Sequence, residues 1–248
     1  MSKIIEGTFL EHLDELRRRL WTMVIAFFAC AAISVFFSDR LLEWVSFPVR
    51  SETTAIYFFT PSDAFTVKIK LAMLAGVFLS SPVIFSQFWS FVSPAMHAHE
   101  RKVIAPLVIV TSGLFMAGAL FAFFKVIPVT LHFLLSMQTE WMRPMISASE
   151  YLSFLTMMSV AFGLAFNSPV FILIPVALGI LNTRVLNQFH RQVVVLIFVL
   201  AAILTPGPDI ASQLLLAIPL LILFELTLIA SFFTERILKK KKQAVVVS

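Results

Sequence analysis

Long apolar runs constrain the fold of this 248-residue chain more than any other feature. Hydrophobic residues make up 59% of the sequence, its mean hydropathy is +0.94, and its charged residues fall in clusters between the apolar runs. This composition does not fit a soluble domain and predicts a protein that crosses a membrane several times. Because lipid offers no partners to unpaired backbone groups, the crossings are expected to be helices and the fold class all-α.

Six apolar runs are predicted as spans of a single integral membrane domain covering residues 1–248. Their approximate bounds are 20–38, 70–92, 103–126, 151–177, 193–204 and 210–233, and a basic tail follows at 235–248. The fifth run amounts to only about 18 Å of helix, against a hydrocarbon core of about 30 Å. We therefore predict a short hairpin of the fifth and sixth helices. The alternative is a longer fifth helix in which Gln192 and Thr205 are buried.

Prolines and an outer segment indicate how the spans depart from a straight bundle. The prolines that lie in four of the spans are Pro82, Pro106, Pro169 and Pro219. Each removes a backbone hydrogen bond, so kinked helices that enclose a concave surface are predicted, although membrane helices also tolerate single prolines. The segment Asp39–Phe47 suits a short helix at the membrane interface, anchored by Trp44 and stopped by Pro48.

The distribution of basic residues predicts the orientation. With the N-terminus inside, the cytoplasmic segments hold 13 of the 19 lysines and arginines, namely Lys3, Arg17, Arg18, Arg19, Arg101, Lys102, Arg184, Arg191, Arg236 and Lys239 to Lys242. Such an excess places both termini in the cytoplasm. The early acids, among them Glu6 and Glu11, argue against an organelle transit peptide and favour a bacterial inner membrane.

Two polar segments at the predicted cytoplasmic face are candidate binding sites. The hinge Phe91–Arg101 contains Glu100, an acid available to a basic partner. Its two histidines lie two residues apart without HExxH or cysteine ligands, so no metal site is predicted. The second segment surrounds Glu15 in the helix before the first span. Its acids either form a second acidic patch or pair within the helix, for instance Asp14 with Arg18.

Polar residues inside the spans are candidates for an intramembrane site. Glu225 lies about 15 Å from the charges at the end of the sixth span, a depth at which an ionisable group faces protein or water. It lines a polar cavity, or it forms a protonated contact between helices. Asn167 and Gln213 are candidates for the same cavity, although uncharged polar groups more often join helices.

Taken together, these residues resemble the TatC family, the C subunit of the twin-arginine protein translocase. The resemblance covers nearly the whole chain and rests on HLDELRRRL (12–20), Phe47-Pro48, TPSDAF (60–65), SPVIFSQFWSFVSPAMHAHERK (81–102), the Asp209 turn with Ser212-Gln213, and AIPLLILFE (217–225). It implies a cup-like fold and a receptor, not an enzyme, that binds twin-arginine signal peptides of folded proteins. Export would use the proton-motive force and no cofactor, and the chain has no P-loop.

The resemblance also implies roles for particular residues. The signal-peptide site would comprise Glu15, Arg17, Phe91, Glu100 and Arg101, where carboxylates meet the fork-shaped guanidinium groups of the peptide. Single-span partner subunits, similar to TatA and TatB, would dock on the fifth and sixth helices, with Gln213 as a polar contact, in a larger and homo-oligomeric complex. Pro48, Asp63 and Asp209 would order the loops.

One departure and one alternative remain. Relatives usually carry a glutamate where this chain has Asn167, which leaves Glu225 as the only deep acid. The alternative function is a proton-coupled transporter of small solutes that uses Glu225 as its relay.

Overall fold

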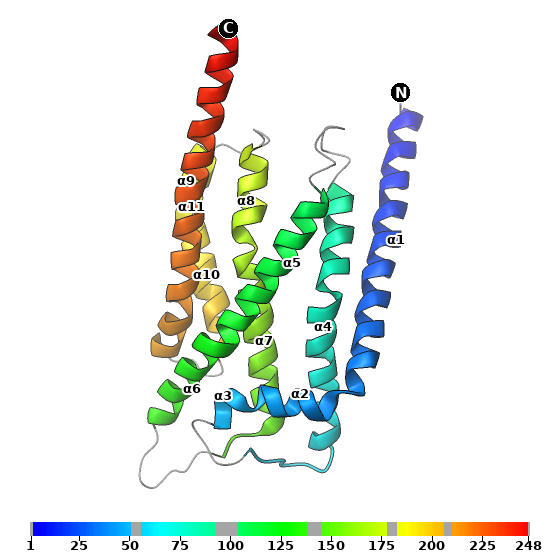
Figure 1. The fold of residues 1–248 in the computed structure, drawn as a ribbon, viewed down its shortest axis with the longest axis vertical. Coiled ribbons are helices and arrows are strands. Elements are labelled where there is room, and N and C mark those ends of the chain that lie inside the picture. The colour runs from blue at the N-terminus through cyan, green and yellow to red at the C-terminus, as the bar shows by residue number, and fades with distance from the viewer. Residues whose placement is uncertain are drawn as a thin grey trace. The chain divides into compact units, whose positions relative to one another are not determined.

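The chain folds almost entirely into helices (Figure 1). The structure, a computed structural model, describes residues 2–50, 56–92, 104–137, 145–177, 183–205 and 210–247. Within these residues there is no β-sheet, only one isolated parallel bridge between Tyr57 and Ser147. The predicted all-α fold class is confirmed.

Five helical segments are long and apolar enough to cross a membrane. They are Leu13–Val35, Asp63–Val92, Ile104–Ser136, Ala148–Val176 and Gln213–Arg236. A sixth apolar helix, α10 (His190–Leu204), has 15 residues and is too short to join them. At about 22 Å it falls short of a hydrocarbon core of about 30 Å, as predicted for the fifth span. It begins three residues earlier than predicted, however, and includes Gln192.

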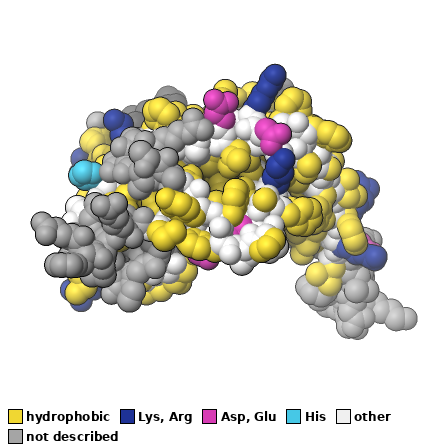
Figure 2. Space-filling model, turned by 90° about the horizontal axis from the view of Figure 1, so that it is seen from below, with side chains coloured by type: hydrophobic (Ala, Val, Ile, Leu, Met, Phe, Trp, Pro, Cys, Tyr) yellow, Lys and Arg dark blue, Asp and Glu magenta, His cyan; other side chains and the backbone are white. Residues whose placement is uncertain are grey.

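The chain divides into two compact units. Unit 1 comprises residues 1–47, 56–116 and 147–152, and unit 2 comprises residues 48–55, 117–146 and 153–248. Large hydrophobic side chains lie on the surface, including Phe36, which is 88% exposed, and Ile222, which is 55% exposed. Figure 2, which views one end of the molecule from below, shows Lys, Arg, Asp and Glu side chains lying among hydrophobic ones. The exposed hydrophobic side chains fit a lipid environment.

Unit 1 is built on two antiparallel helices, α1 (Ser2–Val35) and α4 (Asp63–Val92), which pack along much of their length (Figure 1). Gly76 permits the close approach, because a Cβ atom there would lie 2.8 Å from the Cβ of Ala31. The helix α2 (Ser38–Val45) packs beside α4. The first part of α5 (Ile104–Phe121) and the first turn of α7 (Ala148–Phe166) complete this unit.

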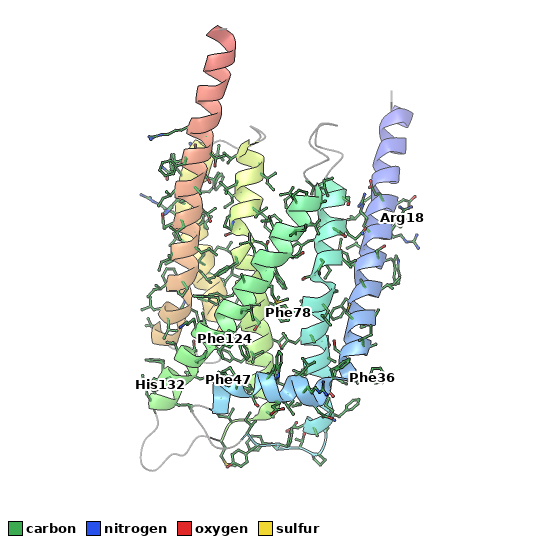
Figure 3. The ribbon with its side chains drawn as sticks, viewed as in Figure 1. Arg18, Phe36, Phe47, Phe78, Phe124 and His132 are labelled. Carbon is green, nitrogen blue, oxygen red and sulfur yellow. The ribbon has the colours of Figure 1, made fainter. Side chains whose placement is uncertain are left out.

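Aromatic and polar contacts hold α4 to α5 near the C-terminal end of α4. The ring of Phe115 lies 5.5 Å from that of Phe78, which is labelled in Figure 3, and 5.8 Å from that of Phe85. Trp89 Nε1 donates to Thr111 Oγ1 at 3.3 Å, and both side chains are buried. The Phe85 and Trp89 contacts lie in the last two turns of α4, close in sequence to Phe91.

Unit 2 is organised around α11 (Ile210–Val247), which packs against four other helices. These are α6 (Ile127–Ser136), α8 (Ser168–Ala177), α9 (Thr183–Gln188) and α10. The basic tail predicted after 235 continues the helix as far as Val247. Glu235 accepts a hydrogen bond from the backbone N–H of Thr183 at 3.1 Å, so α11 also caps α9.

Several helices end or begin at other residues than the predicted spans. The first helix ends at Val35 and not at 38, and it begins far earlier, at Ser2. The third span does not end at 126 but continues to Ser136 through a π-helical turn, η3 (Ala122–Val126). In this turn Ile127 donates to the carbonyl of Ala122, and the wider turn lets the helix pass into α6 just before Pro128.

The predicted interface helix also ends at another residue than expected. The predicted interface helix exists as α2, but it ends at Val45, where Ser46 donates back to the carbonyls of Leu42 and Glu43. Pro48 therefore does not stop it. Instead it is the second residue of the one-turn helix α3 (Phe47–Arg50), a position that requires no backbone N–H.

The prolines lie in two kinds of position. Pro82 and Pro219 lie inside α4 and α11, which remain continuous helices, and Pro106 lies in the first turn of α5. Pro169 is the second residue of α8, directly after the chain leaves α7 at Phe166. Of these four prolines, only Pro169 lies where one helix, α7, ends and the next, α8, begins.

Tyr151 gives a first prediction about stability. Its buried hydroxyl donates to the carbonyl of Val45 at 2.8 Å and joins α7 to α2 within unit 1. Tyr151→Phe is expected to lower the free energy of unfolding by about 1–2 kcal/mol, because the carbonyl loses its donor. Thermally induced labelling of Cys30, the single cysteine, by a maleimide would measure the change in detergent. Tyr57→Phe is the control, since Tyr57 is 42% exposed, and an equal effect of both would contradict the prediction.

Candidate functional site

The first candidate site lies at the end of unit 1 that carries the N-terminal segment. The helix α1 runs without interruption through this segment, so its charged residues lie on a helix surface. Glu15 accepts a hydrogen bond from Arg19 Nε at 3.0 Å, and Arg19 Nη2 contacts the same carboxylate oxygen. Pairing within the helix thus occurs, but it joins Glu15 to Arg19, whereas Asp14 and Arg18 were the example expected from sequence. Arg17 is exposed.

Glu15 and Phe91 lie at the same level of unit 1. The two helices meet closely at Ala31 and Gly76. From that contact Glu15 is about 24 Å along α1, and Phe91 is about 22 Å along α4 in the same direction. The packing of α1 on α4 therefore brings a carboxylate and a half-buried aromatic ring to one end of the unit.

The other residues of the predicted signal-peptide site lie outside the described residues. Glu100 and Arg101, with His97 and His99, fall in the segment between α4 and α5. Asp209 falls in the turn between α10 and α11 and is likewise outside them. Their predicted roles stay predictions.

The second candidate site is a polar pair in unit 2. His190 Nε2 lies 2.6 Å from Glu225 Oε1, so the first residue of α10 is joined to the middle of α11. The side chains are 34% and 51% exposed, and the His190 ring also packs on Phe224, with ring centroids 5.7 Å apart. An acid at this depth is costly unless it is paired, and His190 supplies the partner.

Sequence reasoning missed His190 because the fifth span was predicted to begin at 193. A signal was available. An acid such as Glu225 inside a span needs a hydrogen-bond donor from a neighbouring helix. His190 is a candidate donor, because it lies immediately before the apolar run of the helix that precedes α11. What the sequence could not give is the register of α10 against α11.

Gln213 and Asn167 make separate contacts. Gln213 Nε2 donates to the carbonyl of Phe198 at 2.9 Å and forms a second link between α11 and α10. It lies about 18 Å along α11 from Glu225, so the two mark different levels of the hairpin. Asn167 is fully buried at the break between α7 and α8, where its Nδ2 donates to the carbonyl of Gly163 at 3.1 Å. Its Oδ1 finds no partner among the described residues.

Asp63 orders the loop before α4. Its carboxylate accepts hydrogen bonds from the backbone N–H groups of Phe59 and Thr60 and from the Thr60 hydroxyl, at 2.8, 3.0 and 2.7 Å. The acid thus folds the preceding loop onto the first turn of the helix. An acid near the positive end of a helix dipole is also electrostatically favourable.

The five long apolar helices define the class of this chain: it is a multi-pass membrane protein. Comparison with known proteins then gives the family. The family model described as Sec-independent protein translocase protein (TatC) matches residues 11–219. The chain belongs to the TatC family.

Individual relatives agree with the family match. The chain is 38% identical over 235 residues to the Sec-independent protein translocase protein TatC of Carboxydothermus hydrogenoformans, covering 95% of each chain. It is 35% identical over 239 residues to that of Aquifex aeolicus, covering 95% of this chain and 97% of the relative. A crystal structure of the twin-arginine translocase receptor TatC in DDM superposes with a TM-score of 0.82 at 35% identity, covering 89% of this chain and 99% of the other. The family does not favour the small-solute transporter alternative.

Proposed function

We propose that this chain is the receptor and core subunit of a twin-arginine translocase. It binds the twin-arginine signal peptides of folded proteins and, with partner subunits, exports them using the proton-motive force. The proposal rests on the family and on the words "Twin Arginine Translocase Receptor" used for the similar crystal structures. The excess of basic residues in the predicted cytoplasmic segments supports an orientation with both termini inside.

One observation supports the signal-peptide site above all others: Glu15 and Phe91 lie at the same level on adjacent helices. A carboxylate matches the fork of a guanidinium group with two hydrogen bonds, whereas an ammonium group makes a point contact. An aromatic ring at the same level can pack on the apolar stem or the plane of an arginine. Glu100 and Arg101 would belong to the same site, which would face the cytoplasm.

The partner subunits would dock on α10 and α11. Exposed apolar side chains on these helices, such as Ile203 and Ile222, provide surface for another membrane helix. Close packing and hydrogen bonds between helices drive helix association in lipid. The Glu225–His190 pair supplies an exposed polar group on α10 and α11. Recovery of single-span helices with the detergent-solubilised chain would support this docking, and uptake of a small solute by the chain alone in proteoliposomes would contradict it.

Binding of a labelled signal peptide tests the receptor proposal directly. The purified chain is expected to bind a twin-arginine peptide more tightly than its twin-lysine counterpart. Glu15→Gln should weaken twin-arginine binding about tenfold, because a charged hydrogen bond of about 1.5 kcal/mol is lost. Asp14→Asn is the matched control, since Asp14 is an exposed neighbour on the same helix. Equal binding of both peptides, or an equal effect of the two substitutions, would overturn the proposal.

A further inference from the structure

We propose that Arg19 is an internal competitor of the cargo arginines, which occupies Glu15 in the unliganded receptor and so sets the affinity of the site. The inference rests on the proposed function and concerns the same carboxylate. In place of a peptide guanidinium, Glu15 holds the guanidinium of a residue one helical turn away.

The geometry of the pair is that of a ligand mimic. Two nitrogens of the Arg19 guanidinium, Nε and Nη2, bond to Glu15 Oε1. The Arg19 side chain is 19% exposed and that of Glu15 is 36% exposed, so the contact is partly shielded from water. These are the donors that an arginine of a signal peptide would offer, and a carboxylate oxygen already bonded by both has less capacity for a second guanidinium.

Arg19 differs in this from the arginine beside it. Arg18 has the same charge and lies on the same turn, but it is exposed and points away from α4 (Figure 3). Of these two neighbouring arginines, Glu15 therefore bonds Arg19 and not Arg18. A helix that needed only basic charge at the membrane surface would obtain it equally from Arg18.

Displacement of Arg19 has a definite thermodynamic signature. Binding of any cationic peptide to Glu15 breaks the Glu15–Arg19 pair and forms a new charged pair. The free energy of breaking the Glu15–Arg19 pair therefore weakens the binding of every such peptide by the same amount. Removing the competitor must raise the affinities for twin-arginine and twin-lysine peptides by the same factor and leave their ratio unchanged. A helix-stabilising role alone would raise neither affinity.

The experiment compares Arg19→Gln with Arg18→Gln in the purified full chain, using labelled twin-arginine and twin-lysine peptides. Arg19→Gln is expected to tighten both by about threefold, a magnitude typical of a partly exposed pair one turn apart. Arg18→Gln removes the same charge and measures the general electrostatic effect. The gain of Arg19→Gln over Arg18→Gln is attributed to the competitor.

Two further variants keep the inference falsifiable. In a Glu15→Gln background the additional gain from Arg19→Gln should vanish, because the competitor then has no carboxylate to occupy. Arg19→Lys, which preserves the charge, should give an intermediate affinity. If Arg19→Gln binds no more tightly than Arg18→Gln while wild-type chain binds the twin-arginine peptide, the inference is overturned and the proposed function stands. If wild-type chain binds neither peptide, the proposed function itself fails.

Discussion

Replacing His190 with leucine should lower the free energy of unfolding by about 2 kcal/mol, because it leaves the Glu225 carboxyl group without its partner deep in an apolar helix. The 2.6 Å contact joins α10 to α11 at the level where α10 begins. Gln213 donates a second hydrogen bond between these helices, to the carbonyl of Phe198, and this bond lies near the opposite end. Loss of the pair should therefore loosen one end of the hairpin. Thermal unfolding in detergent measures the effect.

The double substitution His190→Leu with Glu225→Leu gives the sharper result. A polar pair replaced as a whole by apolar groups leaves no unpaired charge, so the double variant should regain most of the lost stability. Arg191→Leu is the control for the histidine change, because Arg191 is the exposed neighbour on α10. A double variant that is less stable than either single variant would show that the pair contributes net stabilisation.

The same set of variants separates stability from function. If the pair serves partner docking, the double variant should be as stable as wild type and yet fail to recover single-span partner helices. If the pair only ties α10 to α11, docking should return together with stability. The measurement is recovery of the partners from detergent at equal amounts of folded chain.

The sequence was sufficient for the fold class and for most helices, because apolar runs of this length have no other stable solution in lipid. The short fifth helix was predicted from its length, since charged or turn-forming residues bound the run on both sides. Predicted helix ends differed from the structure where the backbone changes its hydrogen-bonding pattern locally, because no sequence pattern indicates such a change. The π-helical turn before Pro128 is the clearest example, because the helix continues through it to Ser136, beyond the predicted end of the third span at 126.

The sequence identified the residues of the candidate sites but not the groups to which those residues bond. Glu15 and Glu225 stand out in the sequence because carboxylates are costly or unnecessary where they lie. Which group each one bonds depends on rotamers within α1 and on the register of α10 against α11. Periodicity specifies neither of these. The Arg19 pairing and the His190 pairing therefore emerged only from the three-dimensional structure.

Gly118→Ala is expected to destabilise unit 2 by about 3 kcal/mol, because the added methyl group meets backbone. A Cβ atom at this position would lie 2.5 Å from the carbonyl oxygen of Phe162 and 2.8 Å from the Phe166 side chain. The Phe121 ring already packs against both of these phenylalanines, with centroids 6.1 and 5.4 Å apart. The α7 backbone cannot yield without shifting the aromatic cluster that holds it to α5.

Gly113→Ala provides the matched control on the same helix. Nothing lies within 4 Å of a Cβ atom built at Gly113, so the substitution should be neutral or add up to about 1 kcal/mol through helix propensity. The two variants make the same chemical change, and they should move the thermal midpoint in detergent in opposite directions or by very different amounts. Equal midpoints would mean that α5 and α7 can separate at Gly118 without cost, and the close approach would then contribute nothing to the stability of unit 2.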